Sequence, residues 1–175
     1  WTKQYKAAET EHIPAMESLI DWLPKNIPAG EITTIVHGDY RLDNMIFHPT
    51  EPRILAVLDW ELSTLGHPLA DFSYHCLSWH IAPGMFRGIG GLDLKALGIP
   101  QLDDYIALYS QRTGIQVNKE DFRFYLAYNM FRIAAILQGI AKRVEDGTAS
   151  SAQAKASGAG ATPMAELAWQ FAQRA

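Results

Sequence analysis

The sequence has little of what marks disulfide-linked, membrane-spanning or nucleic-acid-binding proteins. It contains one cysteine, Cys76, so it cannot form an internal disulfide, and this usage is typical of a reducing, cytoplasmic compartment. It contains no apolar run of about 18 residues, which predicts no membrane span and no membrane partner. It has 15 Lys and Arg residues and 19 Asp and Glu residues, and the resulting net charge of −4 argues against binding to nucleic acid.

What is present is the composition of a folded domain. Hydrophobic residues make up 48% of the 175 residues and charged residues 19%, which is too little charge for a disordered chain. The length fits one ordinary domain or a large lobe of a bigger one. The chain begins without methionine and without a basic and apolar leader, so we expect it to start inside a longer protein.

Apolar spacing and turn residues predict an α+β protein that is mainly helical. Apolar residues recur at helical spacing over 13–23, and a β-branched run at 32–36 indicates a strand. Strands at 45–48 and 53–58, joined by the turn 49–52, form a predicted hairpin, and the apolar run of the second strand indicates burial on both faces. The remaining predicted elements are helices at 69–80, 102–111, 118–147 and from 162, a loop at 82–99, and a weak helix or mobile loop at 148–161.

Three oxygen-bearing side chains converge at one end of this hairpin. In an antiparallel pair, the start of the first strand lies beside the end of the second. Asn44 precedes the first strand, and the predicted pairing places it near Val57, two residues before Asp59. Asp39 stands five residues before Asn44 in the same polar loop. We therefore expect these three side chains to lie close together.

The residue types at this point indicate a magnesium site beside a general base. Carboxylate and amide oxygens are ligands for a hard cation and suit Mg²⁺ better than Zn²⁺. A site with two protein ligands, Asn44 and Asp59, leaves coordination positions for phosphate oxygens and water. Asp39 is not needed as a ligand, so it can orient an acceptor hydroxyl and take its proton. This arrangement is typical of a phosphoryl-transfer enzyme.

The motifs around the hairpin carry a resemblance to a known family. Residues 37–44 (HGDYRLDN) resemble the HGDxxxxN catalytic loop of aminoglycoside-phosphotransferase-like kinases, and residues 57–61 (VLDWE) resemble the metal-binding segment of that family. Residues 66–72 (GHPLADF) are similar to the helix start that follows in the family. The longer string 58–68 (LDWELSTLGHP) is most similar to a branch that includes kinase domains fused to acyl-CoA dehydrogenases.

The resemblance implies a role for each matching residue. Asp39 would be the catalytic base. Asn44 and Asp59 would be the Mg²⁺ ligands and would bind the phosphates of ATP, the phosphoryl donor, through the ion. Arg41 stands where protein kinases have a catalytic-loop lysine, so it would act with Asp39 by steadying the γ-phosphate.

Two neighbouring residues are predicted to support the loop rather than to react. His37, which precedes a tight turn, is expected to pack against Trp60, and Asp71 is expected to accept backbone N–H bonds at a helix start or from the catalytic loop. A competing hypothesis makes His37 and Asp39 the ligand pair of a metal-dependent hydrolase. That hypothesis requires further His or Asp ligands, and it fails if His37 points into the core.

The chain lacks parts that a complete two-lobe kinase needs. Only about 31 residues precede the first predicted strand, and the sequence offers no Gly-rich phosphate loop with a following strand lysine. The resemblance therefore implies that residues 1–175 form one protein-kinase-like C-terminal lobe, with the N-terminal nucleotide lobe absent from this chain. Loss of that lobe would expose an apolar face near 32–36 and the hairpin, to be covered by self-association or by residues 1–5 folding back.

The sequence leaves the acceptor open. The leading hypothesis is ATP-dependent phosphorylation of a hydroxyl on a small molecule, which is the expected partner together with the nucleotide. A hydroxyacyl thioester, a sugar and an aminoglycoside are the acceptors considered, and a polycationic aminoglycoside would need an acidic pocket. A further alternative is a non-catalytic, kinase-like binding module, for which the missing lobe argues and the intact Asp39, Asn44 and Asp59 argue against.

Overall fold

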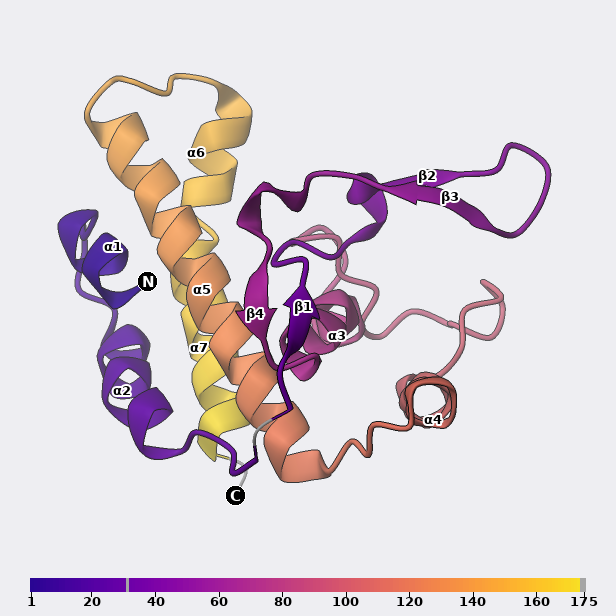
Figure 1. Ribbon diagram of the computed structural model, residues 1–175. Coiled ribbons are helices and arrows are strands. Elements are labelled where there is room, and N and C mark those ends of the chain that lie inside the picture. Colours follow the sequence, from indigo (N-terminus) through magenta and orange to yellow (C-terminus); the bar gives the residue numbers. More distant parts are fainter. Residues whose placement is uncertain (31, 174–175) are drawn as a thin grey trace. The chain divides into compact units, whose positions relative to one another are not determined.

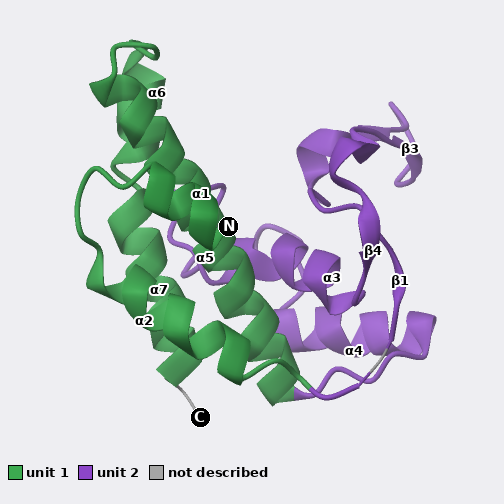
Figure 2. Ribbon diagram, turned by 60° about the vertical axis from the view of Figure 1, so that its left-hand side comes forward, with its two compact units in different colours: residues 1–28, 119–175 green, residues 29–118 purple. Residues whose placement is uncertain are grey.

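The chain forms two compact units in a computed structural model that describes residues 1–30 and 32–173 (Figure 2). Unit 1 comprises residues 1–28 and 119–175, and its described secondary structure is helical, whereas unit 2, residues 29–118, holds the described strands in two small antiparallel sheets. The predicted α+β, mainly helical class is confirmed. None of the described helices is both long and apolar enough to cross a bilayer.

Unit 1 is built along one long helix, α5 (Lys119–Glu145), which ends before Gly147 as the sequence predicts (Figure 1). The helices α1 (Thr2–Ala7), α6 (Ala152–Gly158) and α7 (Ala161–Gln173) pack on α5. The helix α2 (Pro14–Trp22), followed by a 3₁₀ turn at Leu23–Lys25, packs on α7. Its first residue is a proline, whose fixed φ suits the first turn of a helix.

The low-complexity segment at 148–161 contains a helix rather than a mobile loop. The side chain of Ser151 caps α6 by accepting a hydrogen bond from the Ala154 backbone N–H at 3.0 Å. Gly158 allows a close approach to α5, because a Cβ at this position would lie 2.9 Å from the Cα of Ala141. The small residues of this segment therefore permit tight helix packing, which periodicity alone did not reveal.

The N-terminal segment is tied to the helices of unit 1. Tyr5 is fully buried, and the buried amide of Gln138 donates to the Ala8 carbonyl at 3.2 Å and to the Thr10 hydroxyl at 2.6 Å. These contacts anchor residues 1–10 to α5.

Unit 2 carries the polar loop and both sheets. The strand β1 (Thr34–Val36) pairs with β4 (Thr64–Gly66), and β2 (Met45–Phe47) pairs with β3 (Ile54–Val57), both antiparallel. The strand β4 was not predicted, because three residues between turn segments are too few to show an alternating pattern. The elements in order are β1 (Thr34–Val36), a 3₁₀ turn (Leu42–Asn44), β2 (Met45–Phe47), β3 (Ile54–Val57), a 3₁₀ turn (Trp60–Leu62), β4 (Thr64–Gly66), α3 (Leu69–Cys76), a 3₁₀ turn (Leu77–Trp79) and α4 (Leu102–Thr113).

The hairpin of β2 and β3 forms as predicted next to the turn, and its register then changes. The backbone N–H of His48 donates to the Arg53 carbonyl at 2.9 Å. An irregularity within the pair then shifts the register by one residue. Leu58 N–H donates to the Asn44 carbonyl at 2.8 Å. Asn44 therefore lies opposite Leu58, one residue nearer to Asp59 than the sequence predicts.

The strand β3 is not covered on both faces. Ile54 is 45% exposed and Leu55 49%, so the predicted burial of this strand is wrong for this chain. Within the described part of unit 2, each hairpin strand has one partner strand, although the apolar run of β3 is typical of a strand covered on both faces. Further exposed apolar side chains described in unit 2 are Ile32, Ile35, Leu42, Ile46, Phe47, Leu58, Trp60, Leu62, Leu65, Leu92, Leu97 and Leu108.

Candidate active site

The loop that follows β1 is fixed to the first turn of α3 by Asp71. The Asp71 carboxylate accepts the backbone N–H of His37 at 2.5 Å and that of Gly38 at 2.9 Å, one on each oxygen. Gly38 has a φ of 83°, and a Cβ there would lie 2.6 Å from the carbonyl oxygen of Leu62. Only glycine therefore permits the tight turn that leads into Asp39.

His37 is a buried structural residue whose ring nitrogens are both engaged. The residue is 2% exposed, and its ring centre lies 4.8 Å from that of Trp60. Nδ1 accepts the Asp39 backbone N–H at 3.2 Å, which leaves Nε2 to donate to the Leu58 carbonyl at 2.7 Å. Neither nitrogen then offers a lone pair to a metal ion, so the ligand pair that the hydrolase hypothesis needs is not formed.

Asp39 presents a carboxylate that is held from three sides. Its Oδ1 accepts the hydroxyl of Tyr74 at 2.7 Å, and its Oδ2 accepts the amide nitrogen of Asn44 at 2.8 Å. The Nε of Arg41 lies 2.9 Å from the same Oδ2. The Asp39 side chain is 15% exposed, so the carboxylate is oriented by its donors and remains within reach of an incoming group.

Asn44 and Asp59 stand at adjoining ends of β2 and β3. The amide nitrogen of Asn44 donates to the Asp39 carboxylate and carbonyl, so its amide oxygen is the atom left for a cation. Asp59 is exposed and has a φ of 66°, a left-handed conformation that costs a non-glycine residue about 1–2 kcal/mol. Such strained residues cluster at functional sites. An amide oxygen and a carboxylate are donors that suit Mg²⁺, so these residues fit that ion.

Tyr74 is the site residue that the sequence did not reveal. It lies on α3, 35 residues after Asp39, in a segment whose apolar spacing predicts only a core helix. Its hydroxyl reaches Asp39 because Asp71, in the first turn of α3, is hydrogen-bonded to the loop that follows β1. The one available signal was the residue type itself, because phenylalanine would fill a buried position equally well. A buried tyrosine hydroxyl usually has a hydrogen-bond partner.

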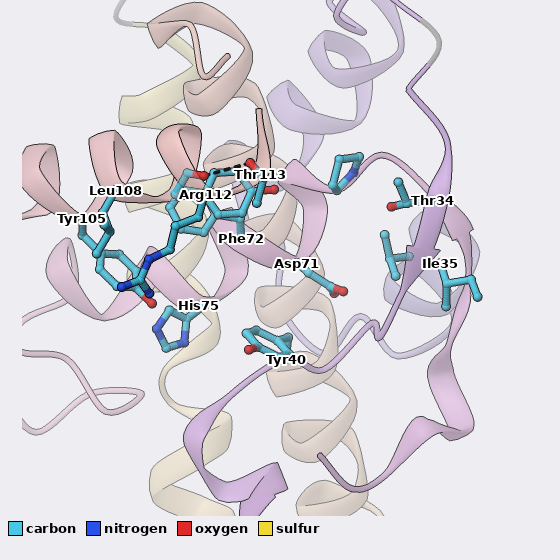
Figure 3. Close-up of a pocket in the computed structure, with 13 residues that line it drawn as sticks. Thr34, Ile35, Tyr40, Asp71, Phe72, His75, Tyr105, Leu108, Arg112 and Thr113 are labelled. Atoms are coloured by element: carbon cyan, nitrogen blue, oxygen red, sulfur yellow. Dashed lines mark hydrogen bonds between the residues drawn. The ribbon is translucent and has the colours of Figure 1, made fainter. Parts of the chain in front are cut away.

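A pocket of about 340 Å³ opens between β1, α3 and α4 in unit 2 (Figure 3). Aromatic side chains form much of its wall, and Phe72 stacks on Tyr109 with ring centres 3.8 Å apart. Tyr40 and His75 lie side by side in it, with ring centres 5.9 Å apart. Asp71 also lines this pocket, but its oxygens accept the N–H groups of the loop that follows β1.

Replacing Asp71 by alanine is expected to destabilise the protein by about 3 kcal/mol, because two part-buried N–H groups lose a charged acceptor. Urea unfolding followed by circular dichroism measures this loss. Asp103→Ala, at an exposed position in the first turn of α4, is the matched control and should change stability by less than about 0.5 kcal/mol. Equal effects of the two substitutions would show that Asp71 does not anchor the loop.

Stability is expected to fall as the pH drops below the ordinary histidine pKa of 6.5, in part because of His75. Burial lowers the pKa of His75. The unfolded chain therefore binds a proton at this residue before the folded chain does, and protonation draws the equilibrium towards unfolding. Urea midpoints at about pH 7.5 and about pH 5.5 should differ less in His75→Gln than in the parent protein. An unchanged difference would contradict this assignment.

The loop and hairpin described above belong to a known family. Residues 1–115 match the phosphotransferase enzyme family (APH), and the chain is a member of that family. A solved structure of a candidate aminoglycoside phosphotransferase from Ralstonia eutropha JMP134 is 68% identical and superposes with a TM-score of 0.94. The match covers 99% of this chain and 53% of that chain. The family resemblance of the catalytic loop is thereby confirmed.

Curated proteins that are similar in sequence are named as acyl-CoA dehydrogenases. This confirms the similarity to the family branch that residues 58–68 indicated. The chain is 53% identical to acyl-CoA dehydrogenase family member 10 of Mus musculus and 40% identical to acyl-CoA dehydrogenase family member 11 of Homo sapiens. It is 34% identical to "Probable acyl-CoA dehydrogenase IBR3" of Arabidopsis thaliana. In each case 99% of this chain is matched, but only 16%, 22% and 23% of the respective relative. The chain thus spans less than a quarter of these proteins.

Proposed function

We propose that this chain is the catalytic and metal-binding lobe of an ATP-dependent phosphotransferase whose acceptor is a hydroxyl group of a small molecule. The observation that carries the proposal is the Asp39 carboxylate, which Tyr74, Asn44 and Arg41 hold at the end of the hairpin that leads to Asp59. Membership of the phosphotransferase family supports the reaction class. A kinase-like C-terminal lobe over residues 1–175, with the nucleotide lobe outside this chain, is part of the proposal.

In the proposed reaction Asp39 accepts a hydrogen bond from the acceptor hydroxyl and takes its proton. The acceptor oxygen forms a bond to the γ-phosphorus as the bond from that phosphorus to the β,γ-bridging oxygen breaks, and ADP leaves with the bonding electrons. The proton remains on the Asp39 carboxylate until it is released to solvent. The hydrogen bond that Oδ2 accepts from Asn44 and its ion pair with Arg41 keep the carboxylate in one orientation while this happens.

Asn44 and Asp59 would hold Mg²⁺ through an amide oxygen and a carboxylate. When bound, the ion supplies positive charge that stabilises the phosphate oxygens of the nucleotide. Arg41 is proposed to steady the γ-phosphate, and its ion pair with Asp39 supports a place beside the reacting groups. Because that pair holds Arg41 at the base, binding of the nucleotide and orientation of the base are expected to depend on each other.

We propose a pocket of about 290 Å³ in unit 2 as the acceptor site, because two of its lining residues, Arg41 and Tyr74, contact Asp39. Most of its wall is aromatic or aliphatic, and Asp and Glu are absent among the described residues that line it. The nearby carboxylates of Asp39 and Asp43 pair with Arg41 and Arg87 at 2.9 and 2.8 Å. A polycation would lack counterions here, which favours an acceptor with an apolar body and no positive charge over an aminoglycoside.

The experiment that tests the proposal is a phosphoryl-transfer screen of the longer protein that contains this chain. The protein is incubated with Mg²⁺ and ATP and with hydroxy acids, their thioesters, sugars and aminoglycosides, and ADP and phosphorylated product are measured. We expect acceptor-dependent ADP formation that stops when the metal is chelated. Nucleotide binding without transfer to any acceptor would support the alternative of a non-catalytic kinase-like module.

A further inference from the structure

The oxygen Oδ1 of Asp39 is held by a residue far away in the sequence. The Tyr74 hydroxyl donates to it at 2.7 Å, and Tyr74 is only 8% exposed. We infer that Tyr74 is a positioning residue for Asp39, whose hydroxyl fixes the plane of the carboxylate that receives the acceptor proton. This inference rests on the proposed function, because it assigns the orientation of the proposed base to one side chain on α3.

The partners of the other oxygen restrain this plane from one side only. Asn44 and Arg41 both meet Oδ2, and the terminal torsion of an aspartate is broad. Rotation about that torsion moves both oxygens together, so a donor on Oδ1 adds a second restraint on the opposite side of the rotation axis. Tyr74 supplies this donor from a helix, where the side chain is held more rigidly than on a loop.

Tyr74 packs against a loop that contains Phe86 and has a strained backbone. The rings of Tyr74 and Phe86 meet edge to face with centres 6.4 Å apart. Phe86 and Arg87 are consecutive non-glycine residues with φ of 39° and 57°, a costly conformation that persists only where the surroundings determine it. A Cβ on Gly88 would lie 2.1 Å from the Ile81 carbonyl oxygen, so the loop is packed closely at its next residue. This conformation places Phe86 against Tyr74.

The hydrogen bond from Tyr74 to Asp39 also lies beside the proposed acceptor pocket. Tyr74, Phe86 and Arg41 all line the pocket of about 290 Å³, so the groups that hold the base also form its wall. A phenylalanine at position 74 would keep the ring and its packing and remove only the hydroxyl. Tyr74→Phe therefore distinguishes a positioning role, which needs the hydroxyl, from a packing role, which needs only the ring.

The test compares Tyr74→Phe with Tyr109→Phe in the longer protein, using an acceptor found in the phosphoryl-transfer screen. Tyr109 stacks on Phe72 in the same unit, so its substitution is a matched loss of one hydroxyl. We expect Tyr74→Phe to lower kcat about tenfold and to change KM for ATP and acceptor by less than about twofold. Tyr109→Phe should leave both constants unchanged. In the Asp39→Asn background, Tyr74→Phe should cause no further loss, because the group that it positions is gone.

A second measurement reads the hydrogen bond without activity. In protein labelled with ¹³C at the tyrosine ring carbon that bears the hydroxyl, the Tyr74 resonance should move in Asp39→Ala and the Tyr109 resonance should not. The inference is overturned if kcat is unchanged in Tyr74→Phe. It is also overturned if Tyr74→Phe lowers kcat as much in the Asp39→Asn background as in the parent protein. Neither result contradicts the role of Asp39 as the base. If Asp39→Asn retains its activity, the proposed function falls, and the inference falls with it.

Discussion

Replacing Asp39 by asparagine is expected to lower kcat of the longer protein by about 10²–10⁴-fold, the usual contribution of a general base. An amide cannot take the proton of the acceptor hydroxyl, although it keeps the size of the side chain. Asn44 and Asp59 remain in place, so binding of Mg²⁺ and ATP should change by less than about threefold. Steady-state kinetics with a saturating acceptor and calorimetry with nucleotide measure the two effects separately.

Two further substitutions show whether the effect of Asp39→Asn is specific to the proposed base. Asp103→Asn makes the same chemical change at an exposed position of α4, and it is expected to leave kcat unaltered. Asp59→Ala should instead weaken the binding of ATP in the presence of Mg²⁺ and have little effect in its absence, because it removes a proposed ligand of the ion. An Asp39→Asn variant with most of the parent activity would show that another group accepts the proton.

The 175-residue chain alone is expected to bind ATP with Mg²⁺ no more tightly than a Kd of about 1 mM, near −4 kcal/mol. In two-lobe kinases the phosphate-covering loop and its lysine partner belong to the other lobe, which we propose lies outside this chain. Ile35 and Leu65, on the paired strands β1 and β4, are 72% and 71% exposed. Such an apolar face is typical of a surface that another part of a protein covers. Isothermal titration calorimetry measures the affinity directly.

The longer protein is the control for this measurement, and it should bind the nucleotide at least tenfold more tightly than the chain alone. The same chain is also expected to self-associate through its exposed apolar face, which sedimentation velocity at several concentrations would detect. Replacing Ile35 and Leu65 by polar residues should reduce that association. Micromolar binding of ATP by the 175-residue chain would contradict the proposed missing lobe.

The sequence predicted the local elements around the site because their signals are local. The β-branched run before His37, the turn between two short strands and the polar residues at both ends of the hairpin gave β1, β2 and β3 within one or two residues. The order of α2, α3, α4, α5 and α7 followed from apolar spacing and from terminal Gly114 and Gly147, both of which have positive φ, whereas α1 was not predicted. These features depend on neighbours a few residues apart, which the sequence displays directly.

The sequence did not predict what depends on distant neighbours. The strand β4 forms because β1 offers it a partner, and its three residues carry no pattern of their own. The apolar run of β3 correctly indicates a strand, but burial depends on what packs against it, and Ile54 and Leu55 are about half exposed in this chain. The one-residue shift of the hairpin also arises from pairing, which moves Asn44 closer to Asp59 without any change in either strand's own sequence.

By itself, the sequence predicted that Asp39 and Asn44 lie together, and the Asn44 amide donates to the Asp39 carboxylate. It also predicted the hairpin that brings the backbone of Asn44 beside Leu58, the neighbour of Asp59. It also determined the family, because the loop and the segment after the hairpin carry the motif residues at fixed spacing. Only the tertiary structure decided how the Asp39 carboxylate is held. For Asp71 the sequence left two roles open, and the structure shows that it accepts the N–H groups of the loop. Tyr74 reaches Asp39 across 35 residues, and a hydrogen bond between segments that far apart follows from how α3 packs, which no local pattern encodes.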